Sequence, residues 1–381
     1  MKRAVIVGAG IGGLTSALAL CRNGWDVSIY EAAQQIAPVG VGIWVPTNAM
    51  TVLDRLGLAQ DVIRAGVELD AIQIRDRTGR LISSIDLHLV RATYGHTTVS
   101  IARAELVRVL LDALPAGILQ LGKKLQRVVV RNSEACAVFR DGSQAVGDLL
   151  IGADGIRSAT REAVCPGVEL RYSGQTCYRG VADITLPAEL AKTVWEVWGG
   201  RRRFGFSAIG PAKVYWFAPV TTTADAGPIT SSDTTELAAA YASFPPPIPE
   251  IIAATRSADI ICTDLFDFVP IPRWHAGRVV LVGDAAHAMT PNLGQGGAQA
   301  IEDGFALAKQ LGGGQHIGAA LEQYEKCRKP KVRRIVNMAW RYGQIAHWER
   351  ASACRCRDAV LRWTPAWVTR LQLAQVYRVD D

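Results

Sequence analysis

The chain has 381 residues, of which 49% are hydrophobic, and this is enough apolar material for a large buried core that we expect to divide into two domains. No uninterrupted apolar run approaches the roughly 18 residues of a membrane span. The glycines between Gly8 and Gly13 interrupt the apolar N-terminus too early for a signal peptide. The composition therefore argues against an integral membrane segment and favours a globular cytoplasmic protein.

The cysteines and histidines give no sign of a metal centre. The eight cysteines are scattered along the sequence, which is typical of reduced thiols in the cytoplasm. Cys354 and Cys356 form the only close pair, and no second pair or histidine cluster stands at a ligand spacing from them. We therefore expect no metal site. The six histidines form no visible catalytic set, and none is assigned as a base.

The formal net charge of +7 is concentrated in the C-terminal segment. Residues 321–381 contain 13 Lys and Arg against 6 Asp and Glu, so this segment accounts for the whole excess and the rest of the chain is balanced. From Tyr324 to Trp363 it is amphipathic, with apolar residues among the charges. Because no long block of one sign is present, we favour a solvated helical face over a nucleic-acid or membrane surface.

The N-terminus carries a glycine-rich motif at a predicted strand-to-helix turn. Residues Arg3–Val7 form a β-branched apolar run, and residues Leu14–Leu20 are good helix formers. A pyrophosphate binds at such a turn because glycines allow the tight turn and the close approach of main chain to phosphate, while N–H groups at the helix start face the negative charge. The glycines of this motif are Gly8, Gly10, Gly12 and Gly13.

An acidic residue completes the predicted dinucleotide site. A second β-branched run, Asp26–Tyr30, ends at Glu31. This residue stands about 20 positions after the glycines, where a carboxylate accepts hydrogen bonds from a ribose diol and would repel a 2′-phosphate. The alternative is a glycine turn in an ordinary βαβ unit.

The middle of the chain predicts a sheet domain inserted into the nucleotide domain at two places. We expect a β-hairpin at 72–76 and 81–85, a helix at 103–114, a β-meander from 126 to 151 and a long antiparallel stretch from 172 to 217. The predicted nucleotide domain, with C-terminal helices, comprises residues 1–70, 97–171 and 264–381, and the predicted substrate-binding sheet domain comprises residues 71–96 and 172–263.

Two segments near residue 290 fit the same nucleotide site. Val279–Val282 has the pattern of a buried strand that delivers Asp284 at its carboxyl end, where open α/β sheets bind ligands. Gly294–Gly297 precede a predicted helix from Ala298 and can present bare N–H groups to an anionic ring edge. Each segment taken alone would be only a strand followed by a turn.

Together these motifs resemble those of class A FAD-dependent monooxygenases, which have the p-hydroxybenzoate hydroxylase fold. The resemblance covers nearly the whole chain and keeps the order of the motifs. It implies an α/β fold, with a Rossmann-like FAD-binding domain and an interleaved, mainly antiparallel β-sheet substrate domain. Besides the N-terminal glycines, it depends on Gly152–Ser158 with Arg161, on Gly283–His287 with Pro291, Gly294–Gly296 and Glu302–Asp303, and on Tyr324–Glu325 with Arg328–Pro330.

By this resemblance, Asp284 binds the ribityl chain of FAD, and the backbone around Gly294 lies beside the isoalloxazine ring. The motif that contains Asp154 is associated in the family with binding of both FAD and NAD(P)H, and Arg103 matches a family arginine near the FAD. The cofactor-binding residues implied beyond the N-terminal motif are Arg103, Asp154, Gly155, Asp284, Pro291, Gly294, Gly296 and Gly297.

The resemblance also implies the chemistry. NADH or NADPH reduces the FAD, oxygen adds to give a C4a-hydroperoxide, and one oxygen atom passes to a small aromatic or N-heteroaromatic substrate. No second glycine-rich fold is visible for the nicotinamide, which agrees with a transiently bound donor. An epoxidase or a geranylgeranyl-type reductase of the same fold is the alternative, and a non-catalytic flavin-binding regulator is another. We expect a monomer or homodimer that binds no nucleic acid.

Two residues are candidates for positioning the substrate. Arg203 begins a predicted strand and the chain returns through a second strand that contains Tyr215, so the two residues could be neighbours across a hairpin. FAD-dependent urate hydroxylases, which this chain also resembles around Glu31–Gly40, have an arginine and a tyrosine with this separation over the substrate. By that resemblance, Arg203 holds an anionic or carbonyl-bearing ring. The alternative is a surface arginine and a core tyrosine. Weaker candidates for the cavity lining are Trp44, Trp195, Met289 and Asn292.

Overall fold

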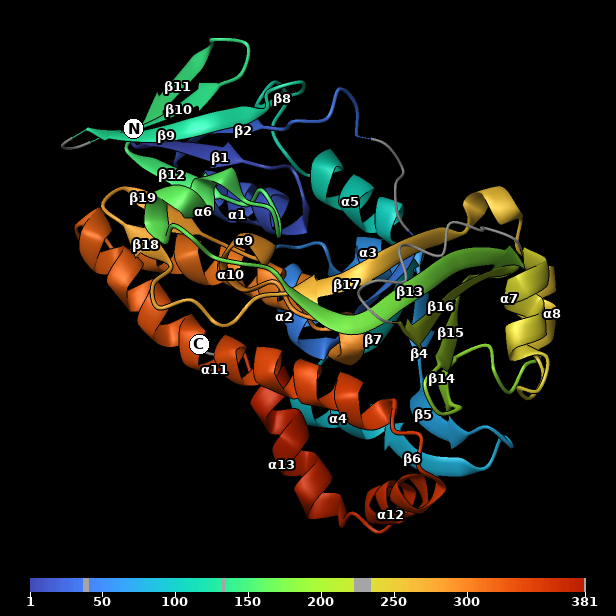
Figure 1. The fold of residues 1–381 in the computed structure, drawn as a ribbon. Helices are drawn as coiled ribbons and strands as arrows, with labels where there is room; N and C mark the ends of the chain where they lie inside the picture. The colour runs from blue at the N-terminus through green and yellow to red at the C-terminus, as the bar shows by residue number, and fades with distance from the viewer. Residues whose placement is uncertain (37–40, 132–133, 223–233, 380–381) are drawn as a thin grey trace.

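The apolar run before the glycine motif forms a central strand of a mainly parallel sheet. The computed structural model describes residues 1–36, 41–131, 134–222 and 234–379, so residues 37–40 of the loop after Glu31 lie outside it. In Figure 1 this sheet forms one end of the molecule. Its strand order is β18 (His275–Ala276), β19 (Val279–Leu281), β12 (Leu149–Gly152), β1 (Arg3–Val7), β2 (Asp26–Tyr30) and β8 (Leu119–Gln120).

The prediction that residues 148–151 continue the β-meander is wrong. These residues form β12, which pairs in parallel with β1 on one side and β19 on the other, and all four of its residues are buried. A strand covered on both faces reads as a continuous apolar run, and its sequence does not say which sheet it joins. The meander itself is a separate three-stranded sheet of β9 (Leu125–Arg131), β10 (Glu134–Phe139) and β11 (Gln144–Gly147).

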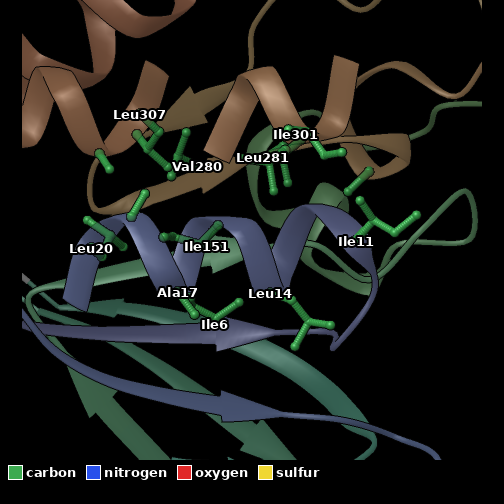
Figure 2. Packing of buried hydrophobic residues seen from close by; sticks show 14 of the residues in the cluster. Ile6, Ile11, Leu14, Ala17, Leu20, Ile151, Val280, Leu281, Ile301 and Leu307 are labelled. Carbon is green, nitrogen blue, oxygen red and sulfur yellow. The ribbon is translucent and has the colours of Figure 1, made fainter. Parts of the chain in front are cut away.

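Helix α1 (Ile11–Arg22) lies between the parallel sheet and helix α10 (Gly296–Gly312) and is buried along most of its length. Figure 2 shows its apolar side chains packed between Ile6 of β1 and Ile301 of α10. The two helices approach closely because glycines face the contact: a Cβ on Gly304 would lie 2.7 Å from the backbone nitrogen of Ser16. This packing fixes the start of both helices at one edge of the sheet.

The second large sheet is mainly antiparallel and has seven strands. The predicted hairpin at residues 72–85 is present, but its first strand pairs in parallel with β14 (Thr193–Trp198), far away in the sequence. The fold is thus the predicted α/β class with an interleaved second sheet. The strand order is β17 (Ile261–Asp267), β13 (Arg171–Asp183), β16 (Lys213–Thr221), β15 (Arg203–Gly210), β14 (Thr193–Trp198), β5 (Ala71–Asp76) and β6 (Leu81–Asp86).

A small three-stranded sheet and short helices lie between and around the two large sheets (Figure 1). The small sheet consists of β3 (Gly42–Val45), β7 (Thr98–Ala102) and β4 (Val67–Leu69). The short helices are α2 (Thr47–Arg55), α3 (Ala59–Ala65), α4 (Leu87–Tyr94), α5 (Arg103–Asp112), α6 (Ala159–Val164), α7 (Thr234–Tyr241), α8 (Ile248–Ala253) and α9 (Asp284–His287), with 3-10 turns η2 (Ser257–Asp259) and η3 (Pro291–Leu293).

The C-terminal segment forms three helices, α11 (Ile317–Ala346), α12 (Ala351–Arg362) and α13 (Ala366–Tyr377). Helix α11 contacts β18, α9 and α10 on the side of the parallel sheet, and α12 contacts β6 of the other sheet. The basic segment therefore spans the two large sheets, with α12 and α13 at the lower edge of the view in Figure 1. Among the described residues, no helix is both long enough and apolar enough to cross a bilayer.

Candidate functional site

The N-terminal glycines divide into two groups by what surrounds them. Gly8 has a φ of 104°, and a Cβ there would overlap the carbonyl oxygen of Ala153, which directly follows the neighbouring strand β12. A Cβ on Gly13 would overlap the carbonyl oxygen of Gly8, and one on Gly12 would lie 3.3 Å from the Cβ of Ala300. Gly10 differs, because no protein atom lies within 4 Å of the position of a Cβ. The fold needs Gly8 and Gly13, whereas the open space at Gly10 is suited to a ligand that approaches the start of α1.

This difference gives a test of cofactor binding. We expect Gly10→Val to weaken FAD binding at least tenfold, because the side chain would occupy the space that the phosphates need. The backbone at Gly10 is extended (φ −76°, ψ 178°), so the unfolding free energy of the apoprotein should change by no more than about 1 kcal/mol. Titration of apoprotein with FAD and thermal unfolding measure the two effects.

The control is Gly8→Ala, where the positive φ and the overlap with Ala153 predict a loss of fold stability as well as of cofactor. Wild-type FAD affinity in the Gly10→Val protein would contradict the assignment of this turn to the pyrophosphate.

Glu31 lies at the edge of a groove that begins at the glycine turn. Its carboxylate accepts hydrogen bonds from the backbone N–H groups of Ala9 (2.8 Å) and Ala33 (2.9 Å). These bonds fix the carboxylate, and each oxygen keeps a lone pair for a further donor such as a ribose hydroxyl. The groove has a volume of about 560 Å³ and is lined by Gly10, Glu31, Gln35 and Arg103 among others.

A second cavity continues from this groove toward the antiparallel sheet. It also has a volume of about 560 Å³, and it shares Gly10 and Arg103 with the first. Its wall on the side of the parallel sheet comprises residues from the N-terminal glycine turn, the turn after β12 and the segment after β19. The sequence-predicted residues that line it are Gly10, Gly12, Arg103, Gly155, Asp284, Pro291, Gly294, Gly296 and Gly297. An elongated dinucleotide therefore fits along one continuous path.

Asp284 faces into this second cavity from the carboxyl end of the strand before it, as the sequence predicted. Its side chain is accessible from the cavity but otherwise surrounded by protein, and this burial raises the pKa of the carboxyl, while the charges of His287 and Arg103 oppose the rise. Gly296 lies close by, since a Cβ there would be 4.0 Å from the Asp284 carboxylate. At Gly297 a Cβ would lie 2.8 Å from Ile43, so only a residue without a side chain leaves this surface open.

The Asp154 carboxylate is bound by donors of its own turn, whereas Asp284 faces the cavity. Its carboxylate accepts hydrogen bonds from the hydroxyl of Ser158 and from both the backbone N–H and the hydroxyl of Thr160. These bonds hold the turn before α6, and Asp154 is absent from the residues that line the cavity, whereas its neighbours Ala153 and Gly155 line it. Asp154 is therefore placed to shape the turn, and the cavity surface there is largely backbone.

A buried ionic network holds the Asp284 segment against α10 and α11. Asp303 accepts hydrogen bonds from the backbone N–H of Gly283 (2.9 Å), from Arg328 Nε (2.9 Å) and from His287 Nε2. Burial raises the pKa of Asp303, but its interactions with His287 and Arg328 outweigh this and lower it to about 2. Glu302 pairs with Arg328 and Lys331. Glu302, Asp303 and Arg328, which belong to separate sequence motifs, thus meet behind the cavity, and none of them lines it.

Arg203 projects from the antiparallel sheet into the cavity. Successive residues of a strand face opposite sides, and the side that faces the cavity carries Arg203 on β15, Glu196 on β14 and Tyr215 on β16. Only 1% of Arg203 is exposed. Its guanidinium donates to Glu196 Oε1 (2.7 Å), to the side-chain oxygen of Asn292 and to Nε2 of His347 (2.9 Å). It is a buried, ion-paired cation, and the surface-arginine alternative is wrong.

The expectation that Arg203 and Tyr215 are neighbours across a hairpin is also wrong. In the register of β15 and β16, Tyr215 lies opposite Ser207, four residues from Arg203 and about 13 Å along the strand. Both side chains line the same cavity, but at separate places. The hairpin turns between Gly210 and Lys213, which pair with each other, whereas residues 203 and 215 are centred on residue 209, so the two cannot lie opposite each other.

Three polar residues of the cavity region were missed by the sequence reasoning. Arg179 of β13 lines the cavity on the side of Tyr215, and Glu196 and His347 surround the Arg203 guanidinium. Glu196 also accepts from the indole N–H of Trp198 (2.9 Å). Alternation within β13 and β14 could have drawn attention to Arg179 and Glu196. His347 follows the last residue of α11 and carries no local signal.

His347 is held in its neutral form. Burial lowers its pKa to about 3, and the positive charges of Arg203 and Arg357 add to the effect. Since Nε2 accepts from Arg203, the ring proton lies on Nδ1, which is 2.8 Å from the hydroxyl of Thr221. The imidazole therefore acts as a hydrogen-bond acceptor that orients the arginine.

The lowered pKa predicts a pH-dependent stability. The unfolded chain protonates His347 below its ordinary pKa of about 6.5, and the folded protein does not until about 3, so the stabilisation is complete above pH 6.5 and falls at lower pH. We expect the unfolding free energy of the wild type to fall by about 1.4 kcal/mol more than that of His347→Gln between pH 7.5 and 5.5. Urea unfolding at both pH values measures this. Equal pH dependence of the two proteins would mean that His347 titrates normally.

Of the four weaker candidates for the cavity lining, three line the cavity and one does not. Trp44, Met289 and Asn292 line the cavity, and Trp44 is fixed by a hydrogen bond from its indole N–H to Ser207 (2.9 Å). Trp195 does not line it, because it alternates with Glu196 on β14 and faces the other side, where it packs against Arg75 (4.2 Å). The eight cysteines are free, and the described residues contain no cluster that could hold a metal ion.

Comparisons with known proteins show the family of the chain. A family model described as an FAD binding domain matches residues 2–339. The chain is 40% identical to the aurachin C monooxygenase/isomerase of Stigmatella aurantiaca, over 94% of this chain and 93% of the relative. It is 33% identical to an FAD-dependent urate hydroxylase of Klebsiella pneumoniae, over 91% of this chain and 90% of the relative.

A solved structure resembles the whole fold. The Klebsiella pneumoniae protein HpxO in complex with FAD and uric acid superposes with a TM-score of 0.91 and 29% identity, over 99% of this chain and 96% of that one. The chain therefore belongs to the family of FAD-dependent aromatic and heteroaromatic monooxygenases with the p-hydroxybenzoate hydroxylase fold, which includes the FAD-dependent urate hydroxylases.

Proposed function

We propose that this protein is a cytoplasmic monooxygenase that uses NADH or NADPH and O2 to hydroxylate a small aromatic or N-heteroaromatic substrate. The relatives support the substrate class: their names include a urate hydroxylase, a 2-heptyl-3-hydroxy-4(1H)-quinolone synthase and a 6-hydroxynicotinate 3-monooxygenase. All three names denote nitrogen heterocycles that carry an oxygen substituent on the ring. Such a ring offers both a flat face and an oxygen atom that can be recognised by a cation.

The observation that carries the proposal is the buried Arg203 cation in a cavity continuous with the dinucleotide groove. A guanidinium has five N–H donors. Glu196, His347 and Asn292 accept three of them, which leaves two for a ring carbonyl or an ionised ring oxygen. Because these partners fix the plane of the guanidinium, a ligand meets a preorganised donor pair and loses little free energy in ordering it.

Residues of this chain would hold the FAD along the path already described. The N–H groups at the start of α1 would face the pyrophosphate, Glu31 the ribose, Asp284 the ribityl chain, and the backbone from Gly294 to Gly297 the ring. Bound FAD would supply the redox and oxygen-activating chemistry. The protein contributes apolar lining residues, among them Ile43, Trp44 and Phe217. They keep water from the reacting centre.

Tyr215 is suited to donate a hydrogen bond and unsuited to act as a base. Burial raises the pKa of its phenol well above the ordinary value, and the charge of Arg179 opposes this only in part. At neutral pH the phenol therefore keeps its proton. We infer that Tyr215 orients the substrate at the end of the cavity away from Arg203, and that a substrate proton leaves by another route.

The test is direct. Purified protein reconstituted with FAD should show flavin absorption bands, and an N-heteroaromatic ligand should accelerate NADH or NADPH oxidation together with oxygen consumption. Mass spectrometry should find a product heavier than the substrate by one oxygen atom. A product heavier by two hydrogen atoms, without oxygen uptake, would instead indicate a reductase. Flavin binding without turnover of any ligand in a heteroaromatic panel would reject the enzymatic proposal.

A further inference from the structure

The surface formed by α12 and α13 exposes large apolar side chains that the fold does not use. The exposed fractions are 80% for Trp363, 64% for Trp367, 63% for Val360 and 56% for Leu371. Val360 and Trp363 are three residues apart and Trp367 and Leu371 are four apart, so the members of each pair are neighbours on the helix surface, and adjoining exposed apolar residues mark interaction sites. We call these four residues, together with the exposed Arg355, Arg362 and Arg370, the C-terminal patch.

Other residues of α12 and α13 pack these helices against the rest of the protein. The inward side of α13 places Leu373, Val376 and Tyr377 in an apolar cluster, where the Tyr377 ring lies 6.0 Å from Tyr94. The inward residue of α12 is Arg357, which donates to the carbonyl oxygens of Ile345 and Ala346 at the end of α11. Of the patch residues, Arg362 also donates to the carbonyl oxygen of Leu81 (3.5 Å), whereas the tryptophans remain outside.

The charges of the patch have one sign. Asp358 is the only acidic residue in the two helices, and it is paired with the buried Arg357 at 2.7 Å. The exposed charged side chains of α12 and α13 are therefore all arginines. An occupant of this surface must combine negative charge with an apolar interior.

We propose that the C-terminal patch docks on an anionic lipid surface, contrary to the solvated helical face that the charge pattern of the sequence favoured, because the exposed residues of the patch combine arginines with large apolar side chains. Tryptophan rings settle at the headgroup level of a bilayer, aliphatic side chains such as Val360 and Leu371 enter the acyl boundary, and arginines bind the lipid phosphates. Phosphates of a nucleic acid would attract the arginines but would leave the aliphatic residues in water.

A second copy of this chain is a poorer occupant. The commonest dimers are two-fold symmetric, and such a contact would place the patch against itself, so that arginines face arginines without an acid between them. Docking on lipid is independent of the proposed reaction, so a failure of either proposal leaves the other standing.

Vesicle flotation of the FAD-loaded protein tests the proposal. We expect the protein to float with vesicles of phosphatidylcholine mixed with phosphatidylserine, and to bind pure phosphatidylcholine vesicles at least tenfold less. Raised salt should release it. Trp363→Ser with Trp367→Ser should reduce binding more than tenfold, and Arg362→Gln with Arg370→Gln about 20- to 30-fold, because each arginine near an anionic surface contributes roughly a fivefold factor.

The control is Val269→Ser, which removes an apolar side chain of 64% exposure outside the patch and should leave vesicle binding unchanged. FAD content and thermal unfolding should be the same in all variants, because the substituted side chains are exposed. The proposal is overturned if the wild type does not bind the mixed vesicles, or if both double variants bind them as well as the wild type does. A concentration-dependent dimer that the tryptophan variant abolishes, without vesicle binding, would overturn it in favour of self-association.

Discussion

Arg203→Lys is expected to lower kcat/KM for the aromatic substrate by about 10- to 100-fold while FAD binding stays intact. Lysine keeps the positive charge beside Glu196 but loses the planar fork, so two parallel hydrogen bonds to the ligand can no longer form. Loss of one charge-assisted hydrogen bond, about 1.5 to 3 kcal/mol, corresponds to a factor of this size. Steady-state kinetics with a flavin spectrum of the same sample measure both quantities.

The choice of substitution matters because Arg203 is also part of the fold. Removal of its charge in Arg203→Gln would leave Glu196 buried without its partner, and a loss of stability would then obscure the kinetic effect. The neighbouring Arg201→Gln is the matched control, since the Arg201 side chain is 53% exposed and pairs with Glu349 at the surface. If Arg203→Lys kept kcat/KM within twofold of the wild type, Arg203 would have no part in holding the substrate.

Arg328→Met is expected to cost about 3 to 5 kcal/mol of unfolding free energy. Arg328 is 2% exposed and is the hydrogen-bond partner of Asp303, Glu302 and Gln299, so its loss leaves buried carboxylates without their main cation. Retention of FAD should fall as well, because Asp303 fixes the backbone N–H of Gly283, next to Asp284. Urea unfolding and the FAD content after dialysis measure the two effects.

Arg333→Met, an exposed arginine on the same helix, should change the unfolding free energy by less than about 0.5 kcal/mol. Equal stability of the two variants would show that the network behind the cavity is not required to support it.

The sequence by itself determined the cofactor half of this protein. The strand, the glycine turn, the helix, the second strand and its terminal acid follow one another within residues 3–31, so this pattern can be read directly from the sequence. The strand that delivers Asp284 is equally local. The fold class and the family followed from these motifs, and both are confirmed. The role of each site residue and the domain boundaries stay predictions.

Only the tertiary structure decided the surroundings of Arg203. Glu196 reaches it through the register of β14 and β15, and His347 reaches it from the end of a helix more than a hundred residues away in the chain. The separate places of Arg203 and Tyr215, and the membership of β12 in the parallel sheet, are likewise decided by pairing between distant strands. Glu196 and His347 belong to the site only because the fold brings them to Arg203. The sequence around each of them does not show that Arg203 lies beside it. The same reason explains the C-terminal patch: amphipathic sequence predicts helices, but packing alone decides which of their faces stays exposed.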